Sequence, residues 1–173
     1  MITRHNGGTL SPAEWLELAW GYFAGGKSEQ AVIAAEMADT LGQSGEAALL
    51  LGIIAWRADH QADEARKRLL TAHTLLPAHP LPAFYLGLIA RQAGDDQAAR
   101  RWLEIACRLG PRLVTGPESP FPVLAEMYTL GGEPDKAISV LRRWTAIDSC
   151  NLHAWRTLGE LLLRFRMDRG GGK

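Results

Sequence analysis

Apolar side chains along this chain recur with the spacing of amphipathic α-helices, and glycine or proline residues separate the helical stretches. The first stretch has one apolar face at positions i, i+3, i+4 and i+7, formed by Trp15, Leu18, Ala19 and Tyr22. Breaks follow at Gly26, Gly94 and Gly132, where a left-handed residue ends a helix at little cost. Pro77 and Pro111 discourage two later stretches from continuing. The pattern therefore predicts an all-α chain of short helices joined by tight turns.

The helical pattern repeats about every 34 residues. In the second helix of each unit, alanines recur at steps of 34, 34 and 38 residues: Ala31, Ala65, Ala99 and Ala137. A first-helix column follows the same frame: Leu18, Gly52, Leu86, Leu124 and Leu158. The four extra residues fall within Arg112–Pro117, so we expect the frame to shift once there and then hold. A period of this size indicates stacked helix pairs, here four pairs and a fifth first helix.

The repeat predicts the organisation of the chain. Residues 1–10 are expected to form a flexible N-terminus, residues 11–167 the helical repeat domain, and residues 168–173 a disordered tail. The last helix, at about Asn151–Met167, is expected to cap the apolar end of the fourth pair. The arginines expected to keep its outer side hydrated are Arg156, Arg164 and Arg166. Three residues depart from the repeat: Gly52 stands where a large side chain is expected, His60 replaces the turn glycine of the column Gly26, Gly94 and Gly132, and Trp144 stands where a small side chain is expected. Trp144 predicts a crossing that closes against the last helix.

Several of these motifs resemble the tetratricopeptide repeat (TPR), over about residues 12–165. Trp15-x-x-Leu18-Ala19-x-x-Tyr22 looks like the first half of that repeat, and Ala99-x-x-x-Leu103 through Ala106 to Pro111 looks like the second half. The resemblance implies a right-handed α-solenoid of antiparallel helix pairs whose first helices line a concave groove. It also implies a protein-interaction module rather than an enzyme.

Projecting the first helices onto such a groove predicts a binding surface. It is mainly apolar over the first three repeats, with two arginines at its edge: Leu16, Trp20, Phe23, Leu50, Ile54, Arg57, Phe84, Leu88 and Arg91. The same columns become more polar toward the C-terminus, at Pro122, Glu126, Thr129, Arg156 and Glu160. Seven sizeable apolar side chains would exceed the roughly 300–600 Å² of a typical monomer's largest patch. We therefore expect a protein or peptide partner with apolar anchors. The alternatives are self-association as a homodimer, cover by residues 1–10, and packing of these side chains between neighbouring first helices.

A narrower resemblance concerns the role of the module. The segments Phe84–Gly94 and Pro120–Glu126 look like the middle and last repeats of TPR chaperones of bacterial type III secretion. That resemblance implies a chaperone whose apolar groove receives a short N-terminal stretch of a secreted client. An assembly scaffold or adaptor of a bacterial multiprotein complex is the alternative.

Composition and charge narrow the remaining functions. Nineteen basic and nineteen acidic side chains give a net charge of zero, and the predicted groove is apolar, which argues against an RNA-binding helical repeat. Residues 1–56 carry a net charge of −4 and residues 151–173 a net of +3, which favours head-to-tail contacts or simply reflects two differently solvated ends. We find no catalytic, metal-binding or cofactor motif, and no apolar run long enough for a membrane span. With only Cys107 and Cys150, the chain is expected to be cytoplasmic.

Overall fold

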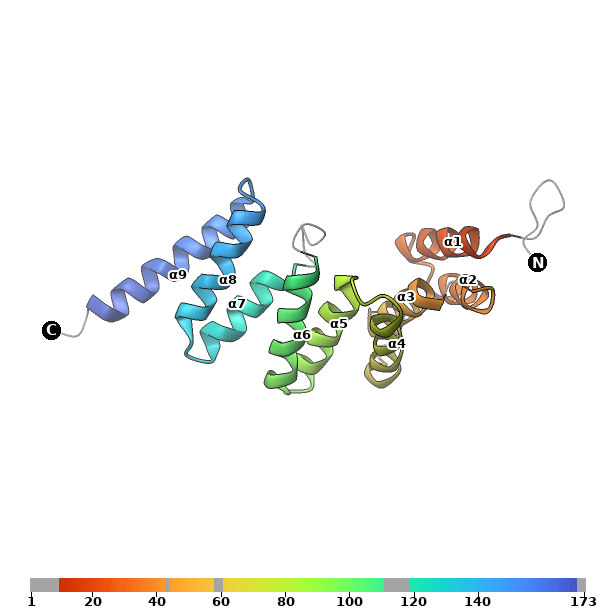
Figure 1. Ribbon diagram of the computed structural model, residues 1–173, viewed down its shortest axis with the longest axis horizontal. Coiled ribbons are helices and arrows are strands. Elements are labelled where there is room, and N and C mark those ends of the chain that lie inside the picture. The colour runs from red at the N-terminus through yellow and green to blue at the C-terminus, as the bar shows by residue number, and fades with distance from the viewer. Residues whose placement is uncertain (1–9, 43, 58–60, 111–118, 171–173) are drawn as a thin grey trace.

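The computed structural model describes residues 10–42, 44–57, 61–110 and 119–170. Within these ranges the chain forms nine α-helices and no strand: α1 (Pro12–Ala24), α2 (Ser28–Thr40), α3 (Ser44–Arg57), α4 (Ala62–Leu75), α5 (Pro80–Gln92), α6 (Asp96–Leu109), α7 (Pro120–Leu130), α8 (Pro134–Ile147) and α9 (Leu152–Gly170). The helices follow one another along a single long axis, with α1 near one end and α9 at the other (Figure 1). The fold is an all-α helical repeat solenoid of four helix pairs followed by α9, as predicted.

The predicted boundaries of the repeat domain stay predictions, since the structure describes only part of the two ends of the chain. The helix α9 continues to Gly170, three residues beyond the predicted Met167, and the glycine run begins only there. Residues 1–9 and 171–173, which belong to the predicted flexible ends, lie outside the described residues.

Proline and glycine fix the ends of the helices. The helices α1, α5, α7 and α8 have proline in their first turn, where the missing N–H needs no partner. Three of the predicted turn glycines have left-handed backbones, with φ of 71° at Gly26, 78° at Gly94 and 73° at Gly132. His60, the fourth member of this column, lies outside the described residues.

Small side chains let the two helices of a pair approach closely. The alanines Ala31, Ala65, Ala99 and Ala137 are fully buried. A second column of small residues, Ala38, Ala72 and Ala106, is also fully buried. Trp144, the large fourth member of that column, is 2 % exposed and stacks on Phe121 with 6.0 Å between ring centroids. Its ring also meets His153 of α9 edge-on at 5.7 Å. The prediction that Trp144 closes the fourth pair against the last helix is confirmed.

The repeat frame shifts at α3 as well as before α7, so the prediction of a single shift is wrong. A Cβ added to Gly52 would lie 2.7 Å from Cγ of Leu69, and one added to Gly87 would lie 2.8 Å from Cγ of Leu103. The two glycines thus make the same contact. However, the leucines are 34 residues apart and the glycines 35. The helix α3 is therefore displaced by one residue relative to α4.

The turn between α3 and α4 contains the extra residue. The N–H of Gln61 bonds the carbonyl of Ala55, six residues earlier, at 2.9 Å. In the other three pairs the corresponding bond spans five residues: Lys27 to Tyr22, Asp95 to Ala90 and Glu133 to Tyr128. Gly52 is consequently no departure from the repeat. It occupies the small-residue position shared by Ala19, Gly87, Ala125 and Gly159.

Candidate partner-binding groove

Four of the predicted groove side chains belong to the core instead. Leu16, Leu50, Ile54 and Phe84 are between 0 and 6 % exposed. Leu50 and Ile54 pack with the alanines of α2 because the one-residue displacement of α3 turns them away from the groove. For these four residues the structure therefore shows packing in the core, which is one of the alternatives to an open binding surface. Large apolar side chains at these positions fill the space between helices.

The other five predicted residues lie wholly or partly at the surface. Trp20 and Phe23 are half-buried and meet edge-to-face, with 6.2 Å between ring centroids. Leu88 is also half-buried, and Arg57 is exposed with its guanidinium 5.7 Å from the centre of the Tyr85 ring. Their role in binding stays a prediction.

Arg91 links two of the first helices across the groove. Its guanidinium lies 2.9 Å from the carboxylate of Glu126, which joins α5 to α7. Both side chains remain substantially exposed, so the pair is accessible to a partner. Both residues belong to the projected groove columns, and their role in binding stays a prediction.

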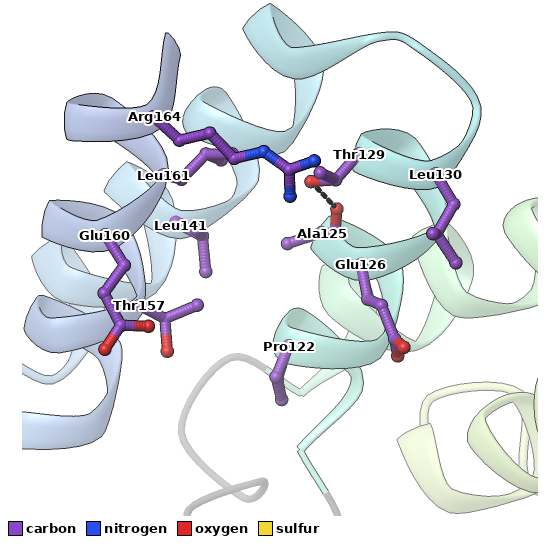
Figure 2. Close-up of a pocket in the computed structure, with 10 residues that line it drawn as sticks. All are labelled: Pro122, Ala125, Glu126, Thr129, Leu130, Leu141, Thr157, Glu160, Leu161 and Arg164. Carbon is purple, nitrogen blue, oxygen red and sulfur yellow. Dashed lines mark hydrogen bonds between the residues drawn. The ribbon is translucent and has the colours of Figure 1, made fainter. Parts of the chain in front are cut away.

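A pocket of about 310 Å³ opens next to this ion pair, between α7 and α9 (Figure 2). Its lining combines apolar, hydroxyl and charged side chains: Pro122, Ala125, Glu126, Thr129, Leu130, Leu141, Thr157, Glu160, Leu161 and Arg164. The buried Leu141 of α8 lies between the two walls and closes the back of the pocket. Leu130, at the mouth, is 77 % exposed.

Side-chain size explains why the pocket opens here. The earlier first helix α5 carries Phe84 and Leu88 at two groove positions, and both pack in or against the core. The equivalent positions of α7 carry Pro122 and Glu126, which are shorter or charged. Because a carboxylate avoids burial and a proline ring is small, the space between α7 and α9 is left unfilled.

The polar side chains of the pocket differ in whether they already have a hydrogen-bond or ion-pair partner. The hydroxyls of Thr129 and Thr157 each donate to a carbonyl of their own helix at 2.8 Å. Glu160 lies 3.7 Å from Arg156, and Glu126 is paired with Arg91. Arg164 extends from α9 toward α7 (Figure 2), and no carboxylate of the described residues lies within ion-pair distance of it. The pocket therefore offers an apolar floor and one guanidinium available to an incoming anion.

The groove columns projected from the sequence include four of the lining residues, Pro122, Glu126, Thr129 and Glu160. The main binding surface, however, was predicted over the first three repeats. The projection missed Leu130, Leu161 and Arg164. The available signal was the change from large apolar to small or charged side chains along the groove columns.

The remaining candidate chemistry is structural. Burial raises the pKa of the Cys107 thiol to about 12, so the reactive thiolate is scarce at neutral pH. No group of three or more histidine, cysteine or carboxylate side chains in the described ranges could hold a metal ion. None of the described helices is long and apolar enough to span a bilayer.

Comparison with known proteins identifies the fold. No protein-family model and no curated protein matches the sequence. Among solved structures, PilF of Pseudomonas aeruginosa is similar with a TM-score of 0.74 and 16% identity over 90% of this chain and 69% of that chain. YrrB, a TPR protein with an unusual peptide-binding site, has a TM-score of 0.65 and 16% identity over 90% of this chain and 78% of its own.

A larger assembly contains a similar stretch. In the APC/C hetero-tetramer Cut9-Hcn1, one chain has a TM-score of 0.67 and 20% identity over 88% of this chain, which spans 30% of that chain's length. These likenesses concern the fold, and with the repeat geometry above they make this chain a TPR-like α-solenoid.

Proposed function

We propose that this chain is a protein-interaction module that binds an extended segment of a partner protein along its concave groove. The observation that carries the proposal is the pocket between α7 and α9, with its apolar floor and its available Arg164. A leucine-, methionine- or phenylalanine-sized anchor suits the floor formed by Pro122, Ala125 and Leu161. A nearby carboxylate of the partner pairs with Arg164 in a charge-assisted bond. Peptide binding by the similarly folded YrrB supports this use of the fold.

The groove surface beyond the pocket extends the same site. Arg91 and Glu126 border the pocket, and Leu88, Phe23 and Trp20 continue the half-buried apolar surface toward α1. Arg57 adds a second exposed cation on α3. We assign to the partner an apolar anchor in the pocket and a flanking stretch over these residues. Nothing in this arrangement brings together a nucleophile and a base, so we propose binding rather than catalysis.

Two finer roles are proposed for this module. The type III secretion chaperone rests on the sequence resemblance of Phe84–Gly94 and Pro120–Glu126 alone. An assembly scaffold rests on the binding surface alone. Both roles use the same groove, so the pocket is the first feature to test.

The test is a selection of random displayed peptides on the purified chain, followed by fluorescence anisotropy with the enriched sequences. We expect enriched peptides to combine one large apolar side chain with a nearby carboxylate. Arg164→Glu should raise Kd about tenfold to a hundredfold, because a charge-assisted hydrogen bond contributes ~1.5–3 kcal/mol. Thr157→Trp should block the pocket sterically.

Arg142→Glu is the matched control, because Arg142 is exposed on α8 and does not line the pocket. It changes the net charge as Arg164→Glu does and should leave Kd unchanged. Peptides that bind Arg164→Glu and Thr157→Trp as tightly as the wild type would refute the pocket as the binding site.

A further inference from the structure

The last helix has two apolar faces, and the described residues cover only one of them. Ala154 and Leu158 are buried against the core, and Leu161 and Phe165 pack on it. The opposite face exposes four large apolar side chains: Leu152 at 83 %, Trp155 at 51 %, Leu162 at 37 % and Leu163 at 66 %. Arg156 and Arg164 leave this face apolar, whereas Arg166 follows Gly159 by seven residues and so falls at the C-terminal end of the face by register. Arg156 lies at its edge, Arg164 turns into the pocket, and the side chain of Arg166 is outside the described part.

At the equivalent positions of the earlier repeats, the second helix of the pair lies against the first helix. Three counterparts of Trp155, namely Ala48, Ala83 and Phe121, are at most 4 % exposed because a second helix covers them, and the fourth, Trp15, is half-buried. At the small-residue position, a Cβ on Gly52 or Gly87 would come within 3.0 Å of a leucine side chain of that second helix. A Cβ on Gly159 would meet nothing within 4 Å. The face of α9 has the pattern of a first helix without its second helix.

We propose that α9 of a second copy of this chain covers this face, antiparallel and centred on Gly159, so that the protein is a two-fold symmetric dimer. Antiparallel packing is the arrangement of the two helices within each pair of this solenoid. Two-fold dimers are also the commonest symmetric assembly, and they require a surface that complements itself.

The side chains of α9 meet that requirement. Trp155 and Leu163 lie four residues before and after Gly159, so in the antiparallel pair each Trp155 meets the other copy's Leu163. The two Gly159 residues face each other, and without Cβ atoms the helix axes approach closely. Arg156 and Glu160 lie one turn apart along one edge of the face. Reversal of the second helix brings Arg156 of one copy near Glu160 of the other.

This interface and the pocket lie on different faces of α9 and share only Glu160, which lines the pocket and lies at the edge of the dimer face. The pocket is lined by Thr157, Glu160, Leu161 and Arg164, whereas the dimer face is formed by Leu152, Trp155, Gly159, Leu162 and Leu163. The inference does not rest on the proposed function, and the variants that test each are different.

The first test is the mass in solution by light scattering and sedimentation. The wild type is expected at twice the chain mass of 18.9 kDa. Gly159→Arg is expected at the mass of one chain, since the added side chain meets open space in the monomer but blocks the close approach of two helices. Gly21→Arg is the matched control, because Gly21 is an equally open helical glycine on α1, and it should remain a dimer.

The second test asks whether residue 159 lies next to itself. In a Cys150→Ser background, Gly159→Cys should form a disulfide-linked dimer on mild oxidation, and Gly21→Cys should not; Cys107 is buried and does not interfere. Four results would each overturn the proposal: a wild-type monomer at every concentration, open-ended or larger assemblies, a dimer that survives Gly159→Arg, or no preferential cross-link at residue 159. Open-ended assemblies that Gly21→Arg disrupts would instead indicate head-to-tail contact.

Discussion

Replacing Gly52 with alanine tests the displaced register of α3. The added Cβ would lie 2.7 Å from Cγ and 3.0 Å from Cδ2 of Leu69, and 3.3 Å from the carbonyl oxygen of Ala65. These neighbours are buried, so α3 and α4 must separate or Leu69 must leave its rotamer, which costs about 1–3 kcal/mol. Alanine also gains about 1 kcal/mol of helix propensity over glycine. The net expectation is a destabilisation of roughly 0–2 kcal/mol.

Gly21→Ala separates the two effects, because a Cβ on Gly21 meets nothing within 4 Å. That variant receives the propensity gain without the clash, so the two variants should differ by about 1–3 kcal/mol, or roughly 2–12 °C in Tm. Gly87→Ala, whose Cβ would lie 2.8 Å from Cγ of Leu103, should behave like Gly52→Ala. Thermal and urea unfolding followed by circular dichroism measures all three. If Gly52→Ala were as stable as Gly21→Ala, the close packing inferred for α3 would be wrong.

Two further predictions concern the contacts between the third and fourth helix pairs, and a third concerns the two thiols. Arg100 pairs with Glu133 at 2.6 Å and donates to the carbonyl of Met127 at 3.2 Å. Arg100→Met should therefore lower the free energy of unfolding by about 1–3 kcal/mol in urea titrations, and an unchanged unfolding midpoint would exclude this role. Hydrogen bonding from Lys136, together with Arg100, lowers the pKa of Glu133. The stabilisation that the ionised Glu133 carboxylate provides is therefore present above the ordinary glutamate pKa and is lost as the pH falls through the lowered pKa of Glu133. Glu133→Gln should reduce the loss of Tm between neutral and acidic pH. Finally, a thiol reagent should modify the exposed Cys150 rapidly in the native protein and the buried Cys107 only after unfolding; equal rates for both would contradict the burial of Cys107.

The repeat was readable from the sequence because its signals are local and recur in phase. Gly26, Gly94 and Gly132 mark turns that need a left-handed residue, and the alanine column from Ala31 onward marks helices that approach closely. Each unit repeats the same constraint, so errors at single positions do not change the predicted architecture. Even Trp144, read as an exception, pointed correctly to the contact with α9.

The register of α3 was hidden for a specific reason. A one-residue insertion in the turn after Arg57 is offset by one residue fewer before Ser44, so the spacing of 34 from Ala31 to Ala65 is preserved. A frame anchored on the second helices therefore carries no trace of the displacement. Gly52 was the sign of the displacement in the sequence. It looked like a departure from the repeat because it was assigned to the position next to its true one.

The proposed binding pocket lies away from the predicted surface for a second reason, which concerns side-chain volume rather than register. A column that faces the groove also faces the neighbouring first helix, and a large apolar side chain at such a position lowers the free energy most by packing against that neighbour. Phe84 and Leu16 do so, and their hydrophobicity marks the core. Pro122 and Glu126 occupy corresponding positions on α7 without filling them, which leaves an open pocket there. In this solenoid the pocket between α7 and α9 therefore opens where large apolar side chains give way to small or charged ones. On α9 the relation between side-chain size and packing is the opposite one. Trp155 and Leu162 have the size of core residues but no described neighbour to pack against, so they stay exposed.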